Sequence, residues 1–306
     1  MAGRHHYVAQ FHLRGFIDPA VDGSADPWLW VADCKTGTVK RRSPKNFGWS
    51  RGLFDGPGAL ANREATLESF LAKEVEGPAA IALRTLTGKE AHRFAGIPPK
   101  LGRYLAWAAA RSLSMKALYE SWIEAVPPLS EVEYAEPPPP GFGEWTEISR
   151  NYRMEHPIHG TKEKVPQDQV EPLRNQGWRL CLRNDDFLGF VHLQAWYFQV
   201  RFFPHLKWLS LRAPQGHHFI IGDRPVVWGF ADRADEAPYW LRHPDVQLAA
   251  PLSRSLALFA YHASNERPEI IKTSDINRII ASAAYDWIAG PTETVIQEAL
   301  LARVYH

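Results

Sequence analysis

Three polar residues near the start of the chain have a spacing that could support chemistry. His6, Gln10 and Arg14 are four residues apart, so they would form one polar stripe, within reach of a single ligand, if residues 5–16 were a short helix. A histidine can act as a general acid or base, and an arginine can stabilise negative charge. The alternative interpretation is an amphipathic helix that docks on the core with this stripe facing water.

Asp223 is the second candidate for chemistry. It follows an apolar, strand-like run within Gly222-Asp223-Arg224-Pro225, so its carboxylate would lie at the end of a strand, where sites are often built. The alternative is a turn in which the carboxylate accepts hydrogen bonds from nearby backbone amides.

A hydrolase site would result if the fold brought these residues together. The predicted catalytic residues are His6, Gln10, Asp223 and Arg111. In a phosphodiester hydrolase, His6 or a carboxylate would activate water, and Arg111 or Arg14 would stabilise the developing charge. A divalent metal is a candidate cofactor, with Glu68 and Asp223 as its ligands. The alternative for Arg111 is a buried ion pair with Glu68 or Glu76.

A basic and aromatic stretch points to a different class, a non-catalytic binding module. Residues 28–32 and 38–42 predict a β-hairpin around the turn Asp33–Gly37. Arginines interleaved with aromatic residues suit single-stranded nucleic acid or a nucleotide, because bases stack and phosphates pair with cations. The predicted ligand-binding residues are Arg14, Arg41, Arg42, Trp49 and Arg224. The alternatives are a surface that binds a protein, or a charged edge strand that prevents aggregation.

Each hypothesis has its own geometric requirement. The hydrolase needs His6 and Asp223 within hydrogen-bond or one-water reach of each other. The binding module needs Arg41, Arg42, Trp49 and Arg51 exposed on one face.

The run His6-Tyr7-Val8-Ala9-Gln10-Phe11-His12-Leu13-Arg14-Gly15-Phe16 resembles the opening H-Y-[VI]-P-Q-F-Y-L-R-x-F of a mainly bacterial family, domain of unknown function 4238. Further similar patches are Leu67-Glu68, Glu76-Gly77, Phe219 to Val226 and Pro251-Leu252-Ser253. Ala9 and His12 differ from the usual proline and aromatic residue, and Gly222 and Arg224 differ from the usual serine and asparagine. The resemblance implies no established activity. It implies a bacterial protein, associated in some members with defence genes.

Composition limits the class of protein. Net charge is +1, with 35 Lys and Arg against 34 Asp and Glu, which argues against a broad footprint for duplex nucleic acid. Two cysteines far apart give no disulfide framework, and no apolar run is long enough to span a bilayer. We therefore expect a cytoplasmic protein without a membrane partner. No P-loop, G-x-S-x-G or H-E-x-x-H motif is present.

The chain predicts an α+β fold in one domain, residues 1–306, with a Pro-rich acidic loop at about 126–146. Helices over residues 60–125 and 185–203 would pack on a mostly antiparallel sheet from the C-terminal half, with the hairpin at one edge. Gly77-Pro78 predicts a break between two helices. Residues 100–125 predict one long helix, and residues 275–289 predict a final helix.

Overall fold

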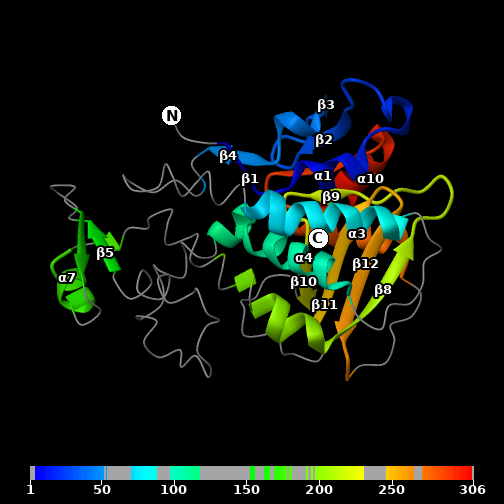
Figure 1. Cartoon of the computed structure of the whole chain (residues 1–306). Helices are drawn as coiled ribbons and strands as arrows, with labels where there is room; N and C mark the ends of the chain where they lie inside the picture. Colours follow the sequence, from blue (N-terminus) through cyan, green and yellow to red (C-terminus); the bar gives the residue numbers. More distant parts are fainter. Residues whose placement is uncertain are drawn as a thin grey trace.

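The structure is a computed structural model. It describes residues 4–51, 53, 70–87, 97–117, 152–155, 162–165, 169–177, 179–180, 191, 194–195, 197–230, 246–264 and 271–304. The fold is α+β, as predicted, and its sheets are antiparallel (Figure 1). No helix in these ranges is long and apolar enough to cross a membrane. The predicted loop at 126–146 lies outside them.

The N-terminal hairpin is part of a four-stranded sheet in the order β3-β2-β13-β9. Its strands are β2 (Leu29–Asp33), β3 (Val39–Arg42), β9 (Ile221–Gly222) and β13 (Trp287–Gly290). The predicted hairpin is confirmed, and Gly37 in its turn has φ 68°, which glycine adopts without steric cost. Because β13 pairs with both β2 and β9, the C-terminal part of the chain supplies an inner strand of this sheet.

β13 corrects the prediction of one final helix over residues 275–289. Helix α9 spans Thr273–Ala283 and ends before β13, and α10 (Glu293–Val304) follows β13. All four residues of β13 are buried. A strand buried on both faces lacks polar–apolar alternation, so in the sequence it resembles a continuation of the helix before it.

The opening of the chain is mostly not helical, which corrects the predicted helix over residues 5–16. β1 (Arg4–His6) pairs with β4 (Trp49–Arg51), and we call these two strands the ribbon. Only Gln10–Leu13 form α1, which a 3-10 turn at Arg14–Phe16 follows. The helical spacing of side chains in the first residues was misleading, because their conformation is determined by pairing with β4, more than 40 residues away in the sequence.

The second four-stranded sheet has the order β10-β11-β12-β8. Its strands are β8 (Leu206–Arg212), β10 (Val227–Phe230), β11 (Val246–Ser253) and β12 (Leu256–His262). Pro251–Ser253 continue β11 through a register shift, and β12 begins at Leu256. A bulge is a position where a strand tolerates proline.

One helical segment runs without a break from Phe70 through a π-helix, η4 (Leu71–Glu76), into α3 (Gly77–Thr87). The predicted break at Gly77-Pro78 is therefore wrong. Proline removes one N–H and crowds the preceding turn, and a wider π-helical stretch before it accommodates this.

Helix α4 (Pro99–Ala110) is almost wholly buried, and in Figure 1 it lies with α3 across the sheet that contains β11 and β12. It ends at Arg111, which has φ −92° and ψ 7°, so the predicted continuous helix over 100–125 is interrupted there. A π-helix, η7 (Phe198–Phe202), and a 3-10 turn, η8 (Phe203–His205), lead into β8.

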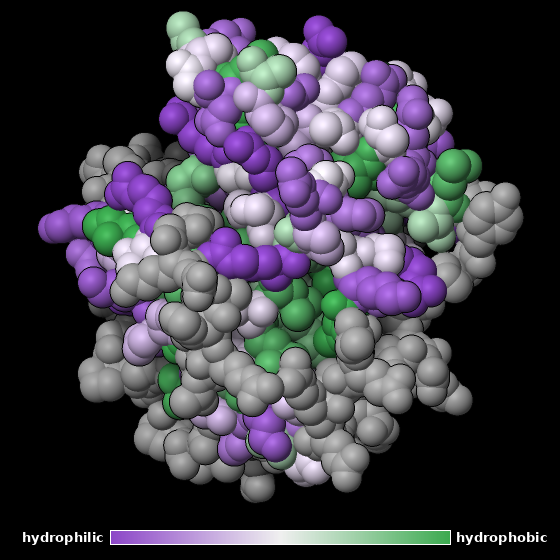
Figure 2. Space-filling model, turned by 90° about the vertical axis from the view of Figure 1, so that its right-hand side faces the viewer, coloured by the Kyte–Doolittle hydropathy of each residue, from purple (hydrophilic) through white to green (hydrophobic). Residues whose placement is uncertain are grey.

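A three-stranded sheet, β6-β5-β7, stands apart from the other sheets in Figure 1. Its strands are β5 (Tyr152–Glu155), β6 (Lys162–Val165) and β7 (Arg179–Leu180), and α7 (Val170–Asn175) contacts β5. Seen from the side, the molecule has hydrophilic residues over its upper part and an apolar area below them (Figure 2).

Candidate functional site

Four side chains with binding chemistry share one face of the ribbon. Arg4 lies opposite Arg51, and His6 lies opposite Trp49. Opposite residues in an antiparallel pair point to the same face, as do residues two apart on one strand. We call Arg4, His6, Trp49 and Arg51 the ribbon face. His5 points to the other side and is buried.

The two arginines of the ribbon face repel each other. Like charges directly opposite across two strands are destabilising. Arg4 and Arg51 are both exposed, and neither forms an ion pair with any residue that the structure describes. An anion bound between the two guanidinium groups would remove this repulsion.

Trp49 gives the ribbon face an aromatic surface. The Arg4 guanidinium carbon lies 4.5 Å from the centroid of the Trp49 ring. The indole Nε1 is buried and has no hydrogen-bond partner within the described ranges. Beside the ring, Gln10 Nε2 lies 3.2 Å from His6 Nε2. The structure therefore brings His6 and Gln10 together, although one comes from a strand and the other from a helix.

A second arginine–tryptophan stack lies on the hairpin. The Arg41 guanidinium carbon is 4.4 Å from the ring centroid of Trp28 and 4.8 Å from that of Trp30. The two indole rings are perpendicular, with centroids 5.6 Å apart. Trp30 Nε1 donates to Asp18 Oδ2 at 3.3 Å, which fixes the ring. Arg41 itself is exposed, so the edge of its guanidinium remains available to a ligand.

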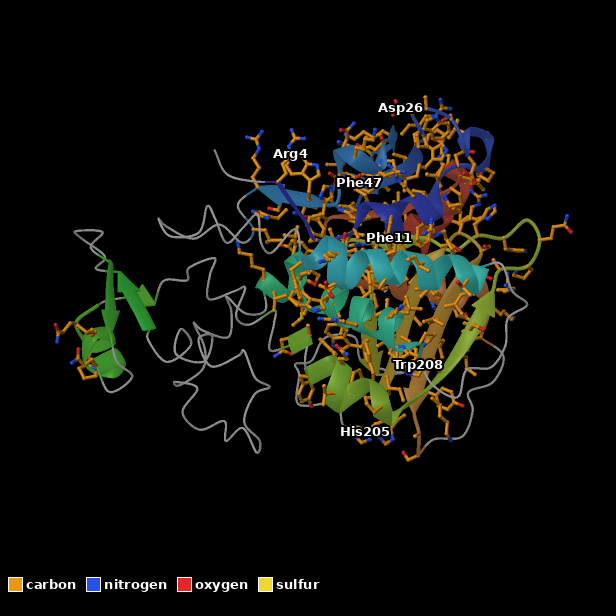
Figure 3. The ribbon with its side chains drawn as sticks, viewed as in Figure 1. Arg4, Phe11, Asp26, Phe47, His205 and Trp208 are labelled. Atoms are coloured by element: carbon orange, nitrogen blue, oxygen red, sulfur yellow. The ribbon has the colours of Figure 1, made fainter. Side chains whose placement is uncertain are left out.

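The segment from β3 to β4 concentrates positive charge. Five cations lie in this segment, and Arg4 of β1 lies opposite its end; we call these six residues the basic band: Arg4, Lys40, Arg41, Arg42, Lys45 and Arg51. None of them forms an ion pair in the part of the chain that the structure describes. Phe47, in the middle of this segment, is buried and packs edge-on against Trp287 with centroids 5.0 Å apart. Arg4 and Phe47 both lie in the upper part of the molecule (Figure 3).

A different set of polar groups is buried in the core. Arg111 Nη2 lies 2.8 Å from Glu76 Oε1, which is the ion pair predicted for Arg111. The Tyr104 hydroxyl lies 2.9 Å from His12 Nδ1, and His12 Nε2 lies 2.7 Å from the Pro251 carbonyl oxygen. Since a carbonyl only accepts, Nε2 carries the proton and Nδ1 accepts from the hydroxyl. We call these five residues the buried network.

Burial determines the charge of the network's titratable groups. It lowers the pKa of His12 to about 4; the hydrogen bond to Pro251 opposes this shift, and nearby Arg111 lowers the pKa further. Burial also raises the pKa of Tyr104. Both side chains are therefore neutral near pH 7, and the network joins α1, α4, η4 and β11 as a structural unit.

Asp223 holds two strands together. Its carboxylate accepts hydrogen bonds from the backbone N–H of Tyr285, at 2.9 Å, and of Asp286. Its own N–H donates to the Trp287 carbonyl at 3.1 Å. Burial raises the pKa of Asp223, and the two backbone hydrogen bonds oppose this shift. The alternative prediction of a carboxylate that holds amides fits this arrangement, but the amides belong to the two residues that precede β13.

The other predicted site residues lie in separate places. Arg14 is exposed in the turn after α1. The Arg224 guanidinium carbon lies 5.6 Å from the Trp228 ring centroid, between β9 and β10. Glu68, a predicted metal ligand, lies outside the described residues. Within those residues, no group of three or more His, Cys, Asp or Glu could hold a metal ion.

Sequence reasoning did not single out Arg4, His12, Tyr104 or the pair Trp28 and Trp30. A usable signal existed only for the two tryptophans, because residues two apart in a predicted strand share a face. Tyr104 and His12 are 92 residues apart, so no local pattern could pair them.

These features define an α+β protein with a basic, aromatic surface near its N-terminus. Residues 4–96 match a family model described as "Protein of unknown function (DUF4238)". This match confirms the resemblance predicted from the opening, and the matched segment contains the whole basic band. Searches of curated proteins and of solved structures find no significant match.

Proposed function

We propose that the chain binds single-stranded nucleic acid through the ribbon face. The observation that carries this proposal is the register of β1 and β4, which puts Arg4, His6, Trp49 and Arg51 on one side. Two exposed guanidinium groups suit a phosphate, and the Arg4–Trp49 pair, with the guanidinium carbon 4.5 Å from the ring centroid, combines a cation with an aromatic ring as base-binding sites do. Exposed bases are present in a single strand and not in a duplex, which favours the single strand.

Binding of a labelled single strand, measured by fluorescence anisotropy over a range of salt concentrations, tests this proposal. Arg51→Glu should weaken binding at least tenfold at low salt and reduce the slope of log affinity against log salt by about 0.7 for each lost phosphate contact. Arg278→Glu is the matched control, because Arg278 is 53% exposed on α9 and has only a 3.8 Å contact with Asp275. Equal affinity of Arg51→Glu and the wild type would refute the proposal.

A phosphodiester hydrolase is the second candidate, favoured by the position of His6. The imidazole shares the ribbon face with two arginines and is held by Gln10 at 3.2 Å. A phosphate on this face would lie next to a possible general acid or base. Product analysis with the same strand tests this function. If His6→Gln binds normally and cleaves as fast as the wild type, or if neither protein cleaves, the hydrolase hypothesis is wrong.

A further inference from the structure

A second anchor lies on the same basic segment as the ribbon face. Arg41 stacks on Trp28 and Trp30 in a corner formed by two perpendicular indoles. It belongs to β3, and the short connection through Pro44–Asn46 leads from β3 to Trp49 on β4. The hairpin therefore repeats the combination of arginine and tryptophan that the ribbon face contains.

The Arg41 stack is preorganised to bind an anion. The two perpendicular indoles hold the guanidinium carbon 4.4 Å and 4.8 Å from their ring centroids, while the side chain as a whole stays exposed to a ligand. The carboxylate of Asp18, next to Trp30, already accepts from Trp30 Nε1 and from the Ala20 N–H. The charge of Arg41 is not compensated by an ion pair among the described residues.

The connection between the two anchors is fixed to the core. Phe47 is buried against Trp287, and Gly48, with φ 72°, lies so close to Leu13 that an added Cβ would be 3.1 Å from its side chain. Lys45, between the anchors, is exposed and unpaired within the described chain. The two stacks are thus presented on a rigid support with a further cation between them.

We infer that the ligand is an extended strand that contacts both arginine–tryptophan stacks, and not a mononucleotide. This inference rests on the proposed function. Two linked anchors raise affinity because the second contact becomes intramolecular. A mononucleotide reaches only one anchor and gains nothing from the other.

The test compares two probes, adenosine 5′-monophosphate and a single strand of about 12 adenylates, within the range of known single-strand site sizes. Arg41→Ala should weaken binding of the oligonucleotide about tenfold, a larger loss than for the mononucleotide, which contacts only one anchor at a time. Arg41→Lys keeps the charge and loses the planar guanidinium with its in-plane donors, so it should weaken oligonucleotide binding by an intermediate factor. Thermal melting checks that both variants fold, and Arg278→Ala is the control.

The outcomes separate this inference from the proposed function. If Arg51→Ala weakens oligonucleotide binding and Arg41→Ala does not, the two-anchor inference is wrong and the proposed function stands. If neither substitution changes binding, or if the wild type binds neither probe, both are wrong. Replacing the ribose oligonucleotide by its deoxyribose equivalent distinguishes RNA from DNA as the source of the strand.

Discussion

The buried network and the basic band are built from the same kinds of residue but have opposite surroundings. In the network, Arg111 is almost fully buried and pairs with Glu76. In the band, Arg41 and Arg51 are exposed and have no ion-pair partner in the described chain. A buried charge must be paired for the fold to be stable, so its pairing says little about function. An exposed stacked cation has no such constraint, and its arrangement is informative about ligands.

The largest expected effect on stability is at the buried end of this comparison. Arg111→Ala leaves Glu76 without its cation and Tyr104 without a neighbouring donor, and removal of one partner of a buried pair is destabilising by about 3 to 5 kcal/mol. Urea unfolding measures this loss. Arg51→Ala, measured in the same way, should change the free energy of unfolding by less than about 0.5 kcal/mol. Similar losses of unfolding free energy in Arg111→Ala and Arg51→Ala would contradict the difference proposed between the buried network and the basic band.

The pH dependence of stability should come partly from His12. Its pKa in the folded protein is about 4, below the ordinary value of 6.5, so the unfolded chain takes up the proton first as pH falls. Above about pH 6.5 the imidazole is neutral in both states, and His12 does not reduce the free energy of unfolding. As pH falls to 4, the free energy of unfolding should decrease by about 3 kcal/mol. His12→Phe should flatten this part of the curve, whatever its stability at neutral pH. An unchanged slope in that variant would show that His12 does not titrate as described.

A smaller loss of stability, without a loss of oligonucleotide affinity, is expected when Asp223 is replaced. Asp223→Ala leaves the partly buried N–H groups of Tyr285 and Asp286 without their acceptor, which should reduce the free energy of unfolding by about 1 to 3 kcal/mol. Oligonucleotide affinity should not change, because this carboxylate is engaged by the backbone of the two residues that precede β13. Loss of binding or of cleavage in a variant that remains folded would instead support the hydrolase assignment of Asp223.

Local patterns in the sequence were sufficient to predict those parts of the structure that depend on neighbouring residues. The hairpin followed from its turn and from Gly37, and the ion pair of Arg111 followed from the cost of burying a charge. The predicted helix over residues 5–16 was wrong because the conformation of β1 depends on its pairing with β4. The strand β13 was missed because burial on both faces removes the alternation of polar and apolar residues. The candidate site was partly predicted in the same way: Arg41, Trp49 and Arg51 follow from composition, but only pairing of the strands puts Arg4 and His6 beside Trp49.

The position of β13 has a consequence for how the protein folds during synthesis. The N-terminal hairpin cannot complete its sheet until residues 287–290 have emerged, since these residues pair with β2. At about 5 to 20 residues per second, this delay is on the order of ten seconds or more. Contacts between segments so distant in sequence also slow folding, because a long loop must close before they form. We therefore expect the edge of β2 that later pairs with β13 to remain unpaired for most of translation. During that time this edge needs protection from pairing with other chains.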